Sequence, residues 1–219
     1  MGAGLIRTYI SGKGKPKGCI IVLPGRHGSA VALMSAYQEA ELTDTVLVGM
    51  EPEQEWYPLP NGVGDQSEAV RGIKKARKAL LRHIGLVQRQ LGFASRQVAL
   101  VGFSAGAVMA IQCGLRSREE LAGVVAHSGA ILQPRKTPAA RFIDMPFLLT
   151  HNEYDTCFSW HERYLPMKKV LRKRGYFVTS LETNDPLMTH GLSRQDVVNA
   201  AIFLSGRLGY QDWRHSTED

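Results

Sequence analysis

The sequence has little of what marks secreted or membrane proteins. Only three of its 219 residues are cysteine, and they lie far apart with no Cys-x-x-Cys pair. This argues against a disulfide scaffold and a structural zinc site, and it makes a reducing compartment the simpler expectation. No apolar run is long enough for a signal peptide or approaches the ~18 residues of a membrane-spanning helix. We therefore expect a cytoplasmic protein.

Acidic residues are missing from one long stretch of the chain. Residues 69–118 hold ten Lys or Arg and no Asp or Glu. The rest of the chain carries 17 basic and 20 acidic residues, so the net charge of +7 is a local excess. We expect one basic surface region rather than a protein that coats nucleic acid.

Apolar runs of strand length alternate with helical patterns. The alternation implies βαβ units and a mostly parallel sheet with helices on both faces, which is an α/β fold. The length and the lack of a linker predict a single domain over residues 1–219. Strands are expected at residues 7–10, 19–23, 45–49, 98–101, 123–126, 146–150 and 177–181, and helices at 29–42, 67–91, 104–114, 161–174 and 193–208.

The longest expected helix, residues 67–91, has an apolar face and a basic face. The basic face holds Arg71, Lys75, Lys78, Arg82 and Arg89. A solvated helix shows the same pattern, but this face can also dock an anionic partner such as phospholipid head groups. The helix offers no Trp or Phe for burial in lipid, so stable membrane insertion is not expected. It also lacks interleaved aromatic residues, which argues against nucleic acid.

The segment Gly102-Phe103-Ser104-Ala105-Gly106 follows an expected strand and opens an expected helix. This Gly-x-Ser-x-Gly spacing suits a tight strand-to-helix turn that exposes a nucleophilic serine, because the small flanking residues let the backbone bend. The amides at the start of the next helix then point toward developing negative charge. The alternative is a glycine-rich turn with a helix-capping serine. We predict Ser104 as a nucleophile.

A second glycine-containing loop, residues 23–28, follows the strand at 19–23. A tetrahedral intermediate carries a full charge on one oxygen and needs two hydrogen-bond donors. The backbone N–H groups of Arg26 and Ala105 are the best pair. The alternative is an ordinary strand-to-helix loop. Neither of the common glycine-rich phosphate-binding patterns is present.

The general base must lie at the carboxyl edge of the sheet. His190 lies in the loop between the last expected strand and the last expected helix, and the order serine, acid, histidine is that of the α/β-hydrolase triad. We predict His190 as the base. The other histidines lie in helices or the tail (His83, His161, His215) or directly after strands, where they can line the site (His27, His127, His151).

The acid that orients the histidine must lie at the same edge. Asp155 follows the strand at 146–150 and is the favoured candidate. Asp185 shares the histidine's loop and is the competitor. Asp144 precedes the strand and so falls on the opposite edge, and Asp196 lies inside the last expected helix.

Residues 51–65 form a long proline-rich loop after the strand at 45–49. Because ligands bind beyond the carboxyl ends of strands in α/β sheets, we predict that Trp56 and Tyr57 help to form a wall of the substrate site. His27 is a further candidate for substrate binding. The alternative is that these two aromatic side chains only cover the core.

Together these segments resemble the phospholipase/carboxylesterase family of α/β-hydrolases, which includes the acyl-protein thioesterases. The resemblance spans residues 18–208. It rests on the loop at 23–29, the turn at 102–106, the pair Ser128-Gly129, and the loops at 151–155 and 188–191. It implies the α/β-hydrolase fold, with Ser104 as nucleophile, Asp155 as acid and His190 as base. The sequence departs from the family at two places. It has Pro24-Gly25 where the family usually has His-Gly, and it has Ala105 where the family often has Gln.

The function predicted from these residues is hydrolysis of a small or medium acyl ester or thioester through an acyl-enzyme. Its partner is a small-molecule substrate, and the chemistry needs no metal and no organic cofactor. The alternative from another class is a non-catalytic binding module that docks an anionic partner through the basic helix. The sequence leaves a homodimer open.

Overall fold

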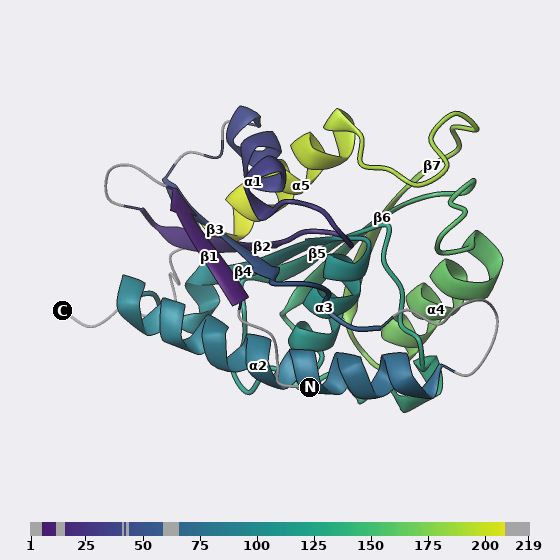
Figure 1. The fold of residues 1–219 in the computed structure, drawn as a ribbon, viewed down its shortest axis with the longest axis horizontal. Helices are drawn as coiled ribbons and strands as arrows, with labels where there is room; N and C mark the ends of the chain where they lie inside the picture. The colour runs from purple at the N-terminus through teal and green to yellow at the C-terminus, as the bar shows by residue number, and fades with distance from the viewer. Residues whose placement is uncertain (1–5, 12–15, 41, 43, 59–65, 209–219) are drawn as a thin grey trace.

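A computed structural model describes residues 6–11, 16–40, 42, 44–58 and 66–208. These residues form one seven-stranded sheet in the order β1-β3-β2-β4-β5-β6-β7 (Figure 1). Strand β1 pairs with β3 antiparallel, and the other neighbouring pairs are parallel. The mostly parallel sheet is therefore confirmed. The strands are β1 (Ile6–Ser11), β2 (Gly18–Leu23), β3 (Thr45–Pro52), β4 (Val98–Phe103), β5 (Gly123–His127), β6 (Pro146–Asn152) and β7 (Phe177–Thr183).

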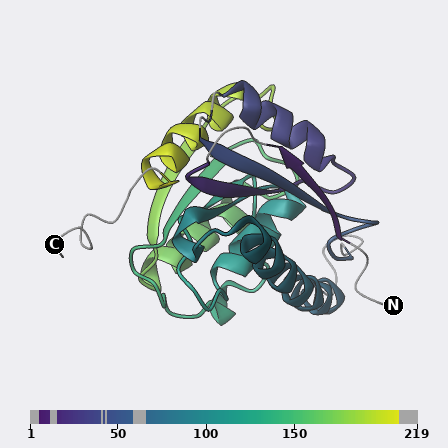
Figure 2. The ribbon, with the colours of Figure 1, turned by 90° about the vertical axis from the view of Figure 1, so that its left-hand side faces the viewer.

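Helices cover both faces of the sheet, as the alternating pattern predicts. Helices α1 (Ala30–Glu39) and α5 (Arg194–Leu208) lie together on one face (Figures 1 and 2). Helices α2 (Ser67–Leu91), α3 (Ala105–Gly114) and α4 (Leu165–Lys173) lie on the other. Among the described residues, no helix combines the length and the apolar character needed to cross a membrane.

Several expected elements differ in extent from those observed, and two of the differences have a visible structural reason. Strand β3 continues past residue 49 to Pro52, because it pairs with the whole of β1, from Ile6 opposite Pro52 to Ser11 opposite Leu47. The expected helix at 161–174 is a π-helical turn, Trp160–Tyr164, followed by α4, with Pro166 in the first turn of α4.

The core consists of two buried clusters, one on each side of the sheet. Every residue of β2 is buried, which explains why this strand is a continuous apolar run rather than an alternating one. Tyr37, Tyr164 and Phe147 are among the largest fully buried side chains. Each large apolar side chain contributes about 1.5–3 kcal/mol when it is removed from water.

Parallel pairing brings the carboxyl ends of β2, β4, β5, β6 and β7 to one edge of the sheet. Leu23 lies opposite Gly102 and Phe103 opposite His127, while Asn152 lies opposite Thr183. The segments that follow these strands therefore start side by side. They carry the residues that the sequence predicts for catalysis.

Candidate active site

Ser104 lies at the sharp turn between β4 and α3. Its backbone has φ 53° and ψ −118°, a conformation that L-residues rarely adopt. Such a backbone costs on the order of 1–3 kcal/mol and persists only where the surroundings enforce it. Here the N–H of Ser104 donates to the carbonyl of His127, 2.9 Å away. The strand–turn–helix that the sequence predicts is thus observed.

The two glycines that flank Ser104 are required by close backbone contacts. A Cβ on Gly102 would lie 2.3 Å from the carbonyl oxygen of Gly106, and a Cβ on Gly106 would lie 2.0 Å from the carbonyl oxygen of Leu23. No side chain fits at either position without movement of the backbone. The spacing of the motif therefore follows from the packing of α3 against the ends of β2 and β4.

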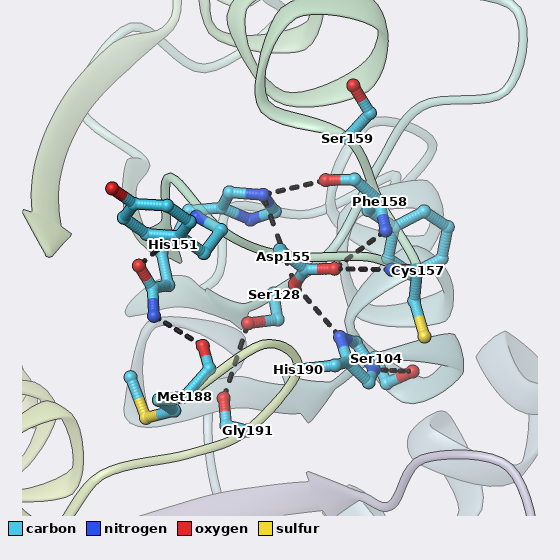
Figure 3. Close-up of polar contacts among 12 residues, drawn as sticks. Ser104, Ser128, His151, Asp155, Cys157, Phe158, Ser159, Met188, His190 and Gly191 are labelled. Carbon is cyan, nitrogen blue, oxygen red and sulfur yellow. Dashed lines mark hydrogen bonds and ion pairs between the residues drawn. The ribbon is translucent and has the colours of Figure 1, made fainter. Parts of the chain in front are cut away.

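Ser104, His190 and Asp155 form a continuous hydrogen-bonded chain (Figure 3). The Nε2 atom of His190 lies 2.9 Å from Oγ of Ser104, and its Nδ1 atom lies 2.8 Å from Oδ2 of Asp155. The imidazole ring also stacks on Phe103, with ring centroids 5.3 Å apart. The structure thus brings together the three residues that the sequence predicts from segments 35 to 86 positions apart.

Asp155 is buried and its carboxylate is well supplied with donors. Oδ1 accepts the backbone N–H groups of Cys157 at 2.8 Å and Phe158 at 2.7 Å. Burial by itself raises the pKa of Asp155, but the hydrogen bonds from His190 and Phe158 outweigh it and hold the pKa below its ordinary value. An ionised carboxylate only accepts hydrogen bonds, so the proton lies on Nδ1 of His190 and Nε2 is free to accept from Ser104.

The loop that carries His190 is fixed by neighbouring side chains. The amide Nδ2 of Asn152 donates to the carbonyls of Met188 and Asp185, the latter at 2.8 Å. Ser128, which has φ 47°, donates through Oγ to the carbonyl of Gly191 at 3.3 Å. These contacts connect the ends of β5 and β6 to the histidine loop, so the ring position depends on three segments at once.

The competing acid, Asp185, uses its carboxylate elsewhere. Its Oδ1 accepts the backbone N–H of Leu187 at 2.9 Å, and its side chain is exposed. Within the described part of the chain, no hydrogen bond links this carboxylate to His190. The geometry therefore favours Asp155 over Asp185 as the partner of the histidine.

The predicted oxyanion segments border the serine on two sides. Ala105 is the first residue of α3, directly after Ser104. A Cβ on Gly25 would lie 3.2 Å from Cβ of Ser104, so the loop that holds Arg26 packs against the nucleophile. The side chain of Arg26 forms an ion pair with Glu55, with 2.5 Å between Nη2 and Oε1. The donor role of the two backbone N–H groups stays a prediction.

Trp56 and Tyr57 are 6% and 4% exposed and pack in the core cluster. This burial favours the alternative that they cover the core. The indole N–H of Trp56 donates to the carbonyl of Pro24 at 2.9 Å, while the hydroxyl of Tyr57 has no partner among the described residues. Residues 59–65 of the same loop lie outside the described residues. His27 is exposed, with φ 54°, and its contact with substrate stays a prediction.

The other two histidines expected directly after strands, His127 and His151, lie buried near the ends of β5 and β6. His127 lies between the hydroxyl of Tyr37 at 2.6 Å and Oγ1 of Thr150 at 2.7 Å. His151 stacks on Tyr164 at a centroid distance of 4.4 Å. Its Nε2 donates to the carbonyl of Phe158 at 2.8 Å, and the N–H of the same Phe158 donates to the carboxylate of Asp155. The apolar strands that precede both histidines were the signal for their burial.

Sequence reasoning did not single out Cys157. Its side chain is exposed, and its Sγ lies within 4.8 Å of both a carboxylate oxygen of Asp155 and a ring nitrogen of His190 (Figure 3). Its position two residues after the predicted acid was the available signal, but proximity to His190 depends on how two loops meet.

A basic groove lies apart from this site. It has a volume of about 1060 Å³ and lies between α2 and the segment at 116–121. Ser104, Asp155 and His190 do not line it. The basic side chains that line it are Lys75, Lys78, Arg82, Arg89, Arg116 and Arg118.

Comparisons with known proteins identify the family and the fold of this chain. A model of the phospholipase/carboxylesterase family matches residues 27–205. The phospholipase/carboxylesterase of Dyadobacter fermentans is similar in structure, with a TM-score of 0.76 and 18% identity over 92% of this chain and 99% of that one. Esterase PE8 has a TM-score of 0.78 and 23% identity over 92% of this chain and 99% of its own.

A plant structure is similar as well. Acyl-protein thioesterase 2 of Zea mays has a TM-score of 0.74 and 16% identity over 93% of this chain and 99% of that one. No significant match is found among curated protein sequences. The structural likenesses show a common α/β-hydrolase fold, which confirms the fold class predicted from the sequence.

Proposed function

The chain belongs to the phospholipase/carboxylesterase family of α/β-hydrolases, and from this premise we propose that it hydrolyses a carboxylic ester or thioester through Ser104, His190 and Asp155. The observation that carries the proposal is the chain of hydrogen bonds of 2.9 Å and 2.8 Å from Ser104 through His190 to Asp155. The members of the family are serine hydrolases, and this chain has a serine in the position to be activated.

In the first half-reaction, Oγ of Ser104 attacks the acyl carbon while Nε2 of His190 takes the hydroxyl proton. Asp155 stabilises the imidazolium that forms. The tetrahedral intermediate places its charge on the former carbonyl oxygen, which accepts hydrogen bonds from the N–H groups of Arg26 and Ala105. His190 then protonates the leaving alcohol or thiol, and the acyl group stays on Ser104.

In the second half-reaction, water attacks the acyl-enzyme and gives its proton to His190. The intermediate collapses, the acid leaves, and the proton returns to Ser104. The proposed substrate carries a small or medium acyl group. We place the reaction in the cytoplasm, and its steps need only this chain, the substrate and water.

The test compares four variants on nitrophenyl esters and acyl thioesters of increasing acyl length. Ser104→Ala is expected to fold and to lose at least ~10³-fold in turnover, and His190→Ala and Asp155→Asn are expected to fall as well. Asp185→Asn is the matched control. It changes a carboxylate in the loop that also carries His190, but this carboxylate accepts a hydrogen bond from the N–H of Leu187 and not from His190. Retained activity in Ser104→Ala contradicts the mechanism, and a loss in Asp185→Asn alone contradicts the choice of acid.

Labelling with a fluorophosphonate separates this proposal from a binding module. Only an activated serine reacts with the probe, so the wild type is expected to be labelled and Ser104→Ala is not. An unlabelled wild type contradicts the proposed hydrolase and favours a non-catalytic role for the fold.

A further inference from the structure

The thiol of Cys157 lies near two members of the proposed triad, Asp155 and His190. Its Sγ, a carboxylate oxygen of Asp155 and a ring nitrogen of His190 all lie within 4.8 Å of one another. Asp155 and Cys157 come from the loop after β6, and His190 comes from the loop after β7. Asp155 and Cys157 are neighbours in the sequence, but His190 lies in a separate loop, so the sequence pattern alone does not indicate this cluster.

The three donors have the chemistry that zinc prefers. Zinc binds thiolate at about 2.3 Å, and imidazole nitrogen and carboxylate oxygen at about 2.0–2.2 Å. Tetrahedral coordination at these lengths sets the donors roughly 3.3–3.8 Å apart. The hydrogen-bonded atoms of Asp155 and His190 are 2.8 Å apart and must separate by about 0.5 Å to admit the metal. Sγ of Cys157, on an exposed side chain within 4.8 Å of both donors, must approach by about 1 Å. Three protein ligands leave a fourth position for water.

We propose that Zn²⁺ binds reversibly to Cys157, His190 and Asp155 and thereby switches off the hydrolase. The inference rests on the proposed function for its effect, but not for the metal site itself. On binding, the thiol of Cys157 releases its proton to water, and the metal takes a lone pair of His190. No electron transfer is involved, so a chelator restores the original state.

Metal binding at Nδ1 of His190, the ring nitrogen that faces Asp155, removes the base. The metal displaces the proton held on Nδ1 and breaks the 2.8 Å hydrogen bond that orients the ring. The displaced proton moves through solvent to Nε2, which then has no lone pair left to accept the proton of Ser104. The buried negative charge of Asp155 favours a cation here. Substrate binding need not change, so the expected effect is on turnover.

The inhibition experiment titrates Zn²⁺ against the purified chain with a nitrophenyl ester as substrate. Each variant is compared with its own metal-free rate. Wild-type activity is expected to fall by at least tenfold at saturating Zn²⁺ and to return with a chelator. In Cys157→Ser the half-inhibitory concentration is expected to rise by at least tenfold, because the hydroxyl is a much poorer zinc ligand than a thiolate.

Two controls separate this site from unspecific metal effects. His161→Asn removes an exposed histidine four residues beyond Cys157 and is expected to keep the wild-type sensitivity. Mg²⁺, which prefers oxygen ligands, is expected to leave the wild-type rate unchanged. Equal Zn²⁺ sensitivity in the wild type and Cys157→Ser overturns the proposal, and so does the absence of inhibition in an active wild type.

A direct binding measurement is independent of catalysis. Ser104→Ala keeps all three ligands, and addition of Co²⁺ to it is expected to produce a thiolate-to-cobalt charge-transfer band that Zn²⁺ displaces. The double variant Ser104→Ala/Cys157→Ser is expected to lack the band. If the band appears while the wild type hydrolyses no ester, the metal site stands and the proposed function fails. Absence of the band in Ser104→Ala overturns the metal site.

Discussion

The indole N–H of Trp56 donates a hydrogen bond to the backbone carbonyl of Pro24, 2.9 Å away and shielded from water. Pro24 belongs to the loop at 23–28, which packs against Ser104 through Gly25. The neighbouring ion pair between Arg26 and Glu55 ties the same two segments together at 2.5 Å. Through Trp56 and Glu55, the segment after β3 therefore fixes the position of the predicted oxyanion loop.

Trp56→Phe keeps an aromatic ring and removes the N–H donor. A single hydrogen bond contributes about 0.5–1.5 kcal/mol, so we expect turnover to fall by about 2- to 10-fold with little change in the Michaelis constant. Tyr57→Phe is the matched control, because it removes a hydroxyl that has no partner among the described residues. Equal kinetics in the two variants would show that the bond does not position the loop, and steady-state kinetics on one ester decides between them.

His127 links stability to pH. Burial lowers its pKa to about 4, and the charge of Asp196 opposes this shift only in part. The unfolded chain, with a histidine pKa near 6.5, therefore binds the proton more readily than the folded chain. Above about pH 6.5 both states are neutral at this residue. Between about pH 6.5 and pH 4, this group makes stability fall as the pH falls, by up to about 1.4 kcal/mol per pH unit.

Urea unfolding at several pH values between 7.5 and 4.5 measures this dependence. In His127→Asn the decline is expected to be shallower, because asparagine does not titrate. A residual slope is expected from His151, whose pKa burial also lowers. An unchanged slope in the variant would contradict the assignment of this pH dependence to His127.

Gly106 has a backbone contact that no other residue tolerates. An added Cβ would lie 2.0 Å from the carbonyl oxygen of Leu23 and 2.4 Å from that of Pro24. We expect Gly106→Ala to destabilise the fold by about 3 kcal/mol or more, since the colliding atoms are backbone. Gly206→Ala in α5 is the control, because an added Cβ there meets nothing within 4 Å. It is expected to leave stability unchanged or to raise it by up to about 1 kcal/mol. Urea midpoints of the two variants provide the measurement.

The sequence predicted some elements closely for identifiable reasons. The helix at 67–91 is observed with those bounds, because its strong amphipathic pattern ends at a glycine, Gly92, with φ 75°. The turn at Ser104 was predictable because only small neighbours fit its tight backbone. The proximity of Asp155 to His190 was predictable because parallel strands deliver their loops to one edge of the sheet.

Other features depend on tertiary contacts that no local pattern encodes. Trp56 lies in a loop beyond the carboxyl end of a strand, where an aromatic residue can face a ligand. In the structure its N–H instead donates to the carbonyl of Pro24 inside the protein. Cys157 approaches His190 only because the loops after β6 and β7 lie together. The π-helical turn at Trp160–Tyr164 likewise has no counterpart in the 3.6-residue pattern that predicts helices.

The basic groove gives the last prediction. Its exposed rim includes Lys78, Arg82 and Arg89 along α2, and Leu86 between them is 49% exposed. Each basic residue near an anionic membrane surface contributes about 1 kcal/mol, and salt weakens the attraction over a Debye length of about 8 Å at 0.15 M. We predict that an anionic lipid surface docks on this charge. We expect co-sedimentation with phosphatidylserine vesicles at low salt that weakens toward 0.15 M.

The triple variant Lys78→Glu/Arg82→Glu/Arg89→Glu is expected to abolish this binding. A second triple variant, Arg172→Glu/Lys173→Glu/Arg174→Glu, is the control for the effect of net charge. It changes the net charge by the same amount at exposed positions outside the groove. The control is expected to keep most of the binding, because the attraction depends on where the charges lie. Equal binding to neutral phosphatidylcholine vesicles, or equal losses in both triple variants, would contradict docking through the groove. In that case the basic face of α2 serves to solvate the helix, and the hydrolase meets its ester in solution.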